Sequence, residues 1–473
     1  SISASEHIIR DLRHRVRESF PCSGDVLMNL VDALAVGPRI GSPFELVVSP
    51  LWGYEGSSLY TALRRGAEEE SVSRLRRARI EWLRDWDEQV RENDPRLGPW
   101  RVRVLDATNY NRPKAETVPR RYVHGVDGMK PGHGLSVLSE RVASGSWHVP
   151  LEMALIPVTC SPTEFGAQQV VQFVEDYGWN PDELLLVDAA YTNAPTLRPL
   201  KQQGVNLLGR VSARRVFFLP PPAYSGKGRP RVRGRKIKLS DARTLPEPEA
   251  SEHVPTEDGR CFDVACWRDV RMRLWPEQPL VLYRIIESRA NGTRRYTRPL
   301  WLIYVGDSAA PRLDHAQALY PSRFGVEHSL RFEKGDLGLV CGQFFGPGAE
   351  PRVQVWIELV ATALWWLWAL RLLAQAEDLP WPRWWRSRRL TPGTVRQVAL
   401  ALLFKLGPDL LIPNGAESPQ GDLKGCAWTP DPATQSFGSE PLALPHNAKE
   451  LHGPSDQQKS SRSLIICAEV CPK

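Results

Sequence analysis

Lysine is scarce in this chain. Of the 61 basic residues among 473, 49 are arginines and 12 are lysines. The difference matters because the planar fork of arginine donates two parallel hydrogen bonds to phosphate, whereas lysine offers a point charge. The net charge is +7 and the pI is about 9.0. This balance favours an anionic partner, with nucleic acid first and an acidic membrane second.

Cysteine pairs with the spacing of a metal site are missing from the sequence. The eight cysteines are scattered, and none forms a CxxC pair or belongs to a His/Cys cluster with zinc-site spacing. The first twenty residues are charged throughout, so we expect no secretory signal peptide there. These features predict a cytosolic protein whose cysteines are all reduced and mostly buried.

Long hydrophobic runs are also lacking, with one exception at residues 353–375. Glu358 and Arg371 interrupt this run, and the part from Leu359 to Leu370 is too short to cross a bilayer. The run therefore predicts a buried core helix. Membrane-surface binding is disfavoured as well, because the positive residues lie in loops rather than on an amphipathic helix. We expect no membrane partner.

The chain is too long for one ordinary core, so two or three domains are expected. Its first part has helix-period apolar residues between charges, and strand patterns with one helix pattern follow. This order indicates an α/β domain with a mixed sheet. The predicted regions are a helical N-terminal region with possible DNA-end binding (1–98), a core in two parts (99–204 and 306–378), a β-rich basic insertion (205–305), a basic, aromatic and then helical segment (379–412) and a disordered tail (413–473).

Two aspartates follow predicted strands. Asp106 ends the strand pattern RVRVLD, and Asp188 ends the apolar pattern ELLLVD. Ligands collect at the carboxyl ends of strands in α/β sheets. An aspartate directly after a buried strand is partly desolvated, so it needs a cation or strong donors beside it. Each of the two, taken alone, also fits an ordinary N-cap or turn residue.

The segment YPSRFGVEHSLRFEK, residues 320–334, predicts a helix with one acid, three cations and a tyrosine on a single face. Val326 and Leu330 lie off this stripe and are expected to face a core. One interpretation is a solvated helix carrying i,i+4 ion pairs. The other is that Glu327 is a metal ligand and the cations hold a polyanion beside it. The residues of the stripe are Tyr320, Arg323, Glu327, Arg331 and Lys334.

Four residues of this stripe resemble the Y-x2-R-x3-E-x6-K signature of a large subgroup of DDE insertion-sequence transposases. The matching positions are Tyr320, Arg323, Glu327 and Lys334. The blocks LDATNYNRPKAETVPRRYVHG and LLLVDAAYTNAPTLRPLKQQGVNLLGRV are similar to those around the first and second aspartate of these enzymes. Their β insertion agrees with the 139 residues from Asp188 to Glu327. The resemblance covers roughly residues 100–400.

The resemblance implies an RNase H-like catalytic core that binds two Mg²⁺ or Mn²⁺ ions through Asp106, Asp188 and Glu327. It implies nicking at transposon ends in double-stranded DNA and attack of the freed 3′-hydroxyl on target DNA, often through a hairpin intermediate. A homodimer on paired DNA ends and a cytoplasmic, nucleoid-associated location are expected. Arg323 and Lys334 would hold phosphates. The predicted DNA contacts of the stripe are Tyr320, Arg323, Arg331 and Lys334.

Two assignments within this resemblance stay open. Some relatives stack a flipped base on a tryptophan of the β insertion, and Trp301 is the candidate by its distance before Tyr320. A core tryptophan on a strand is the alternative. Asp127 competes with Asp106 for the role of first aspartate. Its glycine-rich surroundings, HGVDGMKPGHG, predict a loop, so Asp106 is preferred.

A basic segment lies inside the predicted insertion. Residues 210–238 hold ten Lys or Arg and no acid. The stretch GKGRPRVRGRK resembles a minor-groove hook, an extended Gly-Arg-Pro with flanking cations that fits an AT-rich groove. A solvated basic loop is the alternative, and it would still contact the DNA backbone in a salt-sensitive way. The predicted DNA contacts here are Lys227, Arg229, Arg231, Arg233, Arg235 and Lys236.

The C-terminal segment predicts a helix with Thr391 as N-cap and Pro392 at its first position. The tryptophans of WPRWWRSRR, 381–389, are expected to pack against the apolar helix. The function favoured is a cut-and-paste DDE transposase. The alternative is a domesticated, non-transposing DNA-binding protein that keeps the fold. A plain RNase H-like nuclease or resolvase is disfavoured, because it needs neither the β insertion nor the basic segment.

Overall fold

The structure is a computed structural model, and the residues that it describes all lie in the compact unit Ser1–Ser418. For residues 2, 3, 69, 70 and 121–125 it describes the backbone alone. Asp127, Lys227, most of the predicted segment 379–412 and the predicted tail 413–473 lie outside the described residues. The described residues are 2–49, 51–67, 69–111, 121–125, 128–226, 228–344, 349–375 and 390–407.

The centre of the fold is a mixed sheet with the strand order β4–β3–β1–β5–β6. Strands β4, β3 and β1 pair antiparallel, whereas β1, β5 and β6 pair parallel. Strand β2 pairs with the first residues of β3. The bounds are β1 (Arg101–Asn111), β2 (Arg121–Gly125), β3 (Gly128–Arg141), β4 (His148–Ile156), β5 (Glu183–Val187) and β6 (Asn206–Val211).

Strand β5 shows why this sheet forms. All five of its residues are buried, and a strand covered on both faces has a continuous apolar sequence. The helix α5 (Pro162–Tyr177) packs against β1 and β3, and α6 (Ala194–Gln202) packs against α5. Ser161 caps α5 by accepting a hydrogen bond from the Glu164 amide at 3.2 Å.

The β-rich insertion continues the same sheet instead of forming a separate one. Strand β6 pairs antiparallel with β12, and the order then runs through β11, β10, β7 and β8, with β9 on β10. Strand β6 lies in the predicted insertion, but its parallel pairing with β5 makes it a core strand. The bounds are β7 (Val216–Phe218), β8 (Lys236–Lys238), β9 (Ala250–Pro255), β10 (Cys261–Met272), β11 (Trp275–Ser288) and β12 (Leu300–Val305).

The N-terminal helices pack around one apolar helix, α9 (Ala349–Ala374). By length and apolarity α9 would qualify as a membrane span, but 94% of its most apolar window is buried in the protein. The predicted core helix is therefore confirmed. Helices α1, α2, α4 and α11 surround it. Their bounds, with that of α3, are α1 (Ile2–Glu18), α2 (Gly24–Val36), α3 (Gly56–Arg65), α4 (Glu69–Val90) and α11 (Pro392–Leu406).

The charge in the middle of α9 is neutralised by α4. Glu358 is fully buried and accepts from Arg76 at 2.7 Å and from Arg79 at 2.5 Å. Arg79 also donates to the Thr362 hydroxyl at 2.9 Å. Because a buried carboxylate must be paired, this contact fixes α4 against α9.

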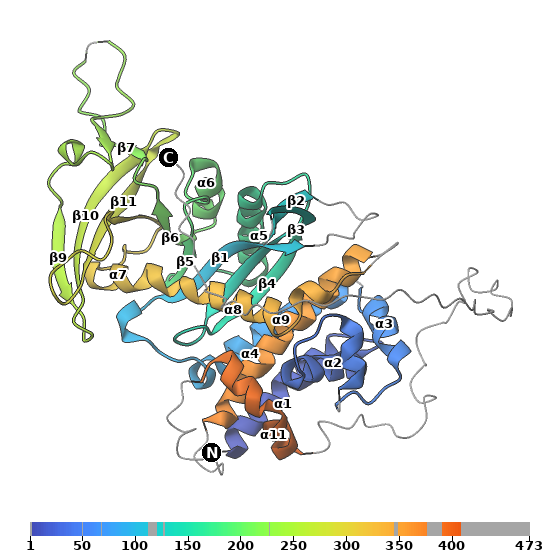
Figure 1. Ribbon diagram of the computed structural model, residues 1–473. Helices are drawn as coiled ribbons and strands as arrows, with labels where there is room; N and C mark the ends of the chain where they lie inside the picture. Colours follow the sequence, from blue (N-terminus) through green and yellow to red (C-terminus); the bar gives the residue numbers. More distant parts are fainter. Residues whose placement is uncertain are drawn as a thin grey trace, which may run out of the picture. The chain divides into compact units, whose positions relative to one another are not determined.

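Two further helices, α7 (Leu313–Ser322) and α8 (Phe324–Gly335), follow the insertion. Figure 1 shows them running in one line from the insertion toward α9. The predicted fold class is confirmed: an RNase H-like mixed-sheet core interrupted by a β-rich insertion, with helical N-terminal and C-terminal regions. Four short 3-10 helices complete the described elements: η1 (Pro43–Val48), η2 (Pro95–Leu97), η3 (Ala242–Thr244) and η4 (Leu339–Cys341).

Local predictions had mixed outcomes. Thr391 caps α11 by accepting from the Thr394 amide, and Pro392 is the first helical residue, as predicted. The glycine-rich stretch predicted as a loop is instead largely strand, because β3 begins at Gly128 and pairs with β1 as far as Gly132. The prediction of mostly buried cysteines is wrong for the described ones. Of these five, Cys266 alone is buried.

Candidate active site

The register of the central strands brings the two predicted aspartates together. Leu105 of β1 pairs with Val187 of β5 in parallel. Asp106 and Asp188 directly follow this pair, so their backbones lie about one strand spacing, roughly 5 Å, apart. Asp106 does not end its strand, contrary to the prediction. It pairs with Val137 of β3, and β1 continues to Asn111. The strand end at this site is that of β5, which ends at Val187, directly before Asp188.

The predicted helix over 320–334 is two helices that meet at Arg323. Pro321, inside α7, lacks the amide proton that would donate the helical hydrogen bond at its position. Arg323 keeps helical backbone angles, φ −56° and ψ −35°, so residues on either side of the junction still share a face. Val326 and Leu330 are 1% and 6% exposed, which confirms that they face the core.

Arg323 joins the strand carboxylate to the helix carboxylate. Its Nη2 donates to Asp106 Oδ2 at 2.9 Å, and its Nη1 donates to Glu327 Oε1 at 3.3 Å. The Arg323–Glu327 contact is an i,i+4 pair, but Arg323 is buried and Asp106 lies 217 residues away. A solvated helix with local ion pairs does not describe this arrangement.

The three predicted carboxylates act on one another electrostatically. Burial raises the pKa of Asp106, and the negative charges of Glu327 and Asp188 raise it further. The Arg323 guanidinium and the Ala107 amide, which donates to Asp106 at 2.9 Å, oppose that rise in pKa. Asp106 is therefore close to two other negative charges and is stabilised by one arginine and one backbone donor.

Lys334 reaches the same strand as Asp106. Its Nζ donates to the Thr108 hydroxyl at 2.6 Å, and burial lowers the pKa of Lys334. Thr108 was not predicted as a site residue from the sequence. Side chains alternate along a strand, so the position two residues after Asp106 was the available signal. The bond places the ammonium group at the second residue after Asp106 on β1.

Two more residues next to Asp188 were missed. Tyr191 lies in the turn after it, where the Tyr191 amide donates to the Asp188 carbonyl at 3.1 Å. Its hydroxyl is buried and has no hydrogen-bond partner among the described residues. Burial and the charges of Asp106 and Asp188 raise the pKa of Tyr191. Arg210 lies beside Asp188 because Val187 pairs with Gly209 of β6.

Tyr320 and Glu333 are buried titratable residues of the two helices. Tyr320 is 2% exposed, and burial raises its pKa to about 12. Glu333 is fully buried, and neither of its oxygens has a partner among the described residues. Burial raises the pKa of Glu333 to about 8, although the positive charges of Arg79 and Lys334 oppose this. Nothing in the sequence around this glutamate indicated that it would be buried without a hydrogen-bond partner.

The basic segment forms an exposed loop between β7 and β8. The Leu219 amide donates to the Arg235 carbonyl at 2.9 Å, and the Gly234 amide donates back to the Leu219 carbonyl at 3.0 Å. Figure 1 shows the loop beyond β7, extending away from the sheet. Lys227 lies outside the described residues. The predicted DNA contacts that are described here are all exposed: Arg229, Arg231, Arg233, Arg235 and Lys236.

Trp301 does not fit the predicted stacking position. It lies on β12 with 2% of its surface exposed, and its ring is 5.8 Å from that of Trp267. The Arg284 guanidinium lies over the Trp267 ring, 5.5 Å from the ring centroid. The alternative, a core tryptophan on a strand, describes Trp301 in this structure, since a buried ring offers no face to a base.

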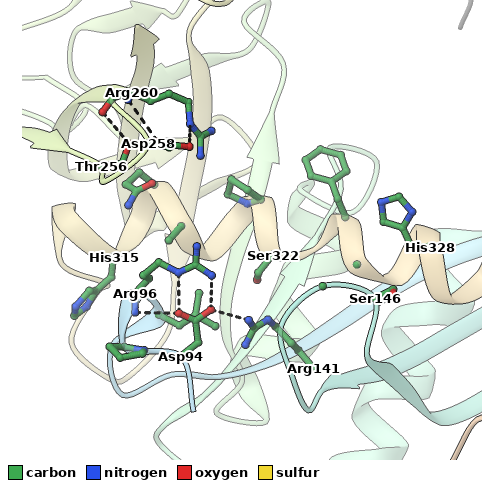
Figure 2. A pocket seen from close by; sticks show the side chains of 18 of the residues that line it. Asp94, Arg96, Arg141, Ser146, Thr256, Asp258, Arg260, His315, Ser322 and His328 are labelled. Carbon is green, nitrogen blue, oxygen red and sulfur yellow. Dashed lines mark hydrogen bonds and ion pairs between the residues drawn. The ribbon is translucent and has the colours of Figure 1, made fainter. Parts of the chain in front are cut away.

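A groove of about 1240 Å³ lies against the same two helices, lined also by η2, the β9–β10 turn and the start of α11 (Figure 2). His328 lines it, whereas Glu327 does not. Acidic side chains of the groove pair with nearby arginines. Asp94 accepts from Arg96 at 2.8 Å and from Arg141 at 2.7 Å. The groove is therefore not the site of the carboxylate triad and lacks the excess positive charge that a polyanion needs.

The carboxylates are chemically suited to a hard divalent cation. Oxygen ligands from a few carboxylates are what Mg²⁺ prefers, and Asp106, Asp188 and Glu327 provide them. As the side chains stand, no group of three His, Cys, Asp or Glu among the described residues is arranged to hold a metal ion. The guanidinium of Arg323 lies between two of the three. The donor set fits, and the side chains would have to converge.

Comparison with known proteins gives a family match that covers part of this site. No curated protein matches the chain. The cryo-EM structure of a piggyBac transposase synaptic complex with hairpin DNA aligns with 90% of this chain and 88% of its own, at 10% identity and a TM-score of 0.32. A similarity at that level establishes neither a common fold nor a common function. A family model described as DDE superfamily endonuclease matches residues 58–273, which include Asp106 and Asp188. Over that region, the chain is similar to the DDE superfamily endonucleases.

Proposed function

We propose that this protein is a metal-dependent DDE transposase of the Tyr-Arg-Glu-Lys subgroup. It cuts transposon ends and joins the freed 3′-hydroxyl to target DNA. The observation that carries the proposal is the link from Asp106 through Arg323 to Glu327, at the point where the strands of Asp106 and Asp188 run side by side. The similarity to DDE superfamily endonucleases over 58–273 supports it.

Asp106, Asp188 and Glu327 would hold two Mg²⁺ or Mn²⁺ ions. Such ions, when bound, activate the attacking oxygen and stabilise the leaving oxygen of a phosphodiester. The strand register supports this role for the two aspartates because it holds both on rigid neighbouring backbones. Glu327 is the adjustable member, since its side chain is 50% exposed.

The cations around the triad would bind the DNA end. Lys334 is held at Thr108 and can offer its remaining protons to a phosphate oxygen. Arg210 is exposed next to Asp188. Arg331 is exposed on α8 as well, but it lines the groove described above, which Glu327 does not line. The loop between β7 and β8 would contact the backbone of double-stranded DNA farther along the duplex. A homodimer on paired ends completes the proposal.

The proposal is tested by cleavage of duplexes taken from the DNA that flanks the coding sequence. We expect nicking that depends on Mg²⁺ or Mn²⁺. We also expect Asp106→Ala, Asp188→Ala and Glu327→Ala each to lower the rate by a factor of about 1000 or more while DNA binding persists. Asp263→Ala is the matched control, because Asp263 is an exposed acid of the insertion paired with His253. A variant that still cuts at the wild-type rate removes that residue from the site.

The loop is tested by its dependence on salt. We expect neutralisation of Arg229, Arg231, Arg233 and Arg235 to weaken DNA binding. The slope of log K against log salt should fall by up to about 3.6, since each phosphate contact contributes about 0.9. Fluorescence anisotropy at several salt concentrations measures this. Thermal stability should stay unchanged because the four side chains are exposed. An unchanged slope means that the loop does not contact DNA.

A further inference from the structure

The guanidinium of Arg323 divides its hydrogen bonds between two carboxylates. One terminal nitrogen binds Asp106 and the other binds Glu327, so neither acid is held in a bidentate pair, the stronger geometry for arginine and carboxylate. The Glu327 bond is the longer of the two, 3.3 Å against 2.9 Å. Arg323 holds both acids loosely and could exchange them for another anion.

The charge balance explains why Arg323 is needed in the free protein. Three carboxylates interact at this point, and Asp106 is largely desolvated, with 18% of its side chain exposed. Without a cation between them, the acids of β1 and α8 would repel one another at short range and low dielectric. Arg323, itself 6% exposed at the side chain, supplies that cation.

We propose that Arg323 is a resident counter-ion that occupies the carboxylates until DNA arrives, and that it thereby couples metal binding to DNA binding. This inference rests on the proposed function. A divalent cation that takes Asp106 and Glu327 must displace the guanidinium or bind against its charge. A DNA phosphate that takes the guanidinium frees both carboxylates. Each ligand therefore favours the other, and by linkage the factor is the same in both directions.

The coupling gives the site a safeguard against cutting without a bound end. In the free protein, divalent cations bind weakly because Arg323 opposes them. The phosphate of an end in the site draws Arg323 away, so the carboxylates become available when there is a bond to cut. A purely structural role for Arg323 predicts something different, namely lower stability on its removal and no gain in metal affinity.

The experiment measures Mn²⁺ binding to the full chain by electron paramagnetic resonance, with and without a duplex of flanking DNA. For Arg323→Gln without DNA, we expect Mn²⁺ affinity at least tenfold above wild type. Addition of the duplex should raise wild-type affinity by a similar factor and leave that of Arg323→Gln nearly unchanged. Arg312→Gln is the charge-matched control, because Arg312 pairs with Asp314 on the exposed start of the same helices, and it should match wild type.

A second variant guards against misfolding. Arg323→Lys keeps the charge but cannot bridge both acids, so its DNA-free affinity should lie between those of wild type and Arg323→Gln. If folded variants bind Mn²⁺ no more tightly than wild type does, while wild type binds Mn²⁺ in the presence of DNA, the coupling is wrong and the proposed function stands. If no form binds Mn²⁺ with or without DNA, the proposed function fails together with the coupling.

Discussion

Two clusters in this protein pair arginines with carboxylates, and they leave their acids in different states. Between α4 and α9, Glu358 is fully buried, and its oxygens accept from Arg76 and Arg79. At the candidate active site, Glu327 is half exposed and shares one arginine with Asp106. The first cluster is closed, since both of its carboxylate oxygens are used. The second keeps acceptor oxygens for a ligand that the chain does not provide.

The two clusters differ in the number of arginines available for each acid. Two arginines meet Glu358, whereas Arg323 faces three acids. The side chain of Asp188 makes no hydrogen bond or ion pair among the described residues. A closed pair between two helices serves packing, and an open group of acids on strand ends is the arrangement that metal-dependent phosphodiester chemistry uses. Variants that disturb each cluster should therefore affect different properties.

The largest effect on stability is expected at the closed cluster. Arg79→Ala leaves Glu358 buried with one partner fewer and should lower the free energy of unfolding by about 3 to 5 kcal/mol. Urea denaturation followed by circular dichroism measures it. Arg323→Ala is the comparison, and it should cost less, because Glu327 can turn to water. Equal losses for both variants would show that the two clusters are alike.

Glu333 should make the stability of the protein depend on pH. It interacts with Arg79 of the closed cluster and with Lys334 of the candidate active site. The folded protein keeps its proton to about pH 8, whereas the ordinary glutamate pKa is 4.5. The unfolded chain therefore releases this proton first as the pH rises. Between about pH 4.5 and 8 folding binds a proton, so the contribution of Glu333 is fully present below 4.5 and is lost as the pH rises through 8.

Glu333→Gln cannot ionise and should remove that part of the pH dependence. At pH 8 we expect it to be more stable than wild type by on the order of 4 kcal/mol, with a smaller difference at pH 5. Denaturation curves at both pH values measure this. Glu350→Gln, at an exposed position of α9, is the control and should follow wild type. A parallel pH profile for Glu333→Gln would mean that Glu333 is ionised in the folded protein.

Much of the fold could be predicted because local patterns encode it. The apolar runs of β5 and β12 and the apolar length of α9 are readable within a few residues. The stripe on α7 and α8 was found in the same way, by helical spacing. The glycine-rich start of β3 was not, because its strand depends on pairing with β1 and β2, which lie elsewhere in the chain.

The candidate site could be predicted in its acids but not in its contacts. Asp106 and Asp188 follow apolar strand patterns, and Glu327 lies in a signature. The contacts of Arg323 with Asp106 and of Lys334 with Thr108 join residues 217 and 226 positions apart, so no local pattern reports them. The two interpretations of Trp301 stayed open for a related reason: spacing along the chain does not tell which face of β12 is covered.

The smallest effect is expected from the removal of a single hydroxyl group. Tyr191 has a buried hydroxyl without a partner at the open site, whereas the Tyr283 hydroxyl donates to the Pro311 carbonyl at 2.6 Å. An unsatisfied buried polar group costs about 1 to 3 kcal/mol, and a satisfied one contributes about 1 kcal/mol. Tyr191→Phe should therefore raise the free energy of unfolding by about 1 kcal/mol, and Tyr283→Phe should lower it by a similar amount.

Urea denaturation of both variants, with the ring kept in each case, isolates the hydroxyl group. If Tyr191→Phe destabilises the protein as much as Tyr283→Phe does, the Tyr191 hydroxyl has a partner in solution and the open site is better satisfied than its geometry indicates. If it stabilises the protein, the chain keeps an unsatisfied donor next to Asp106 and Asp188 at a cost in stability. A donor retained in that way is expected where a site is built to complete its hydrogen bonds with a ligand.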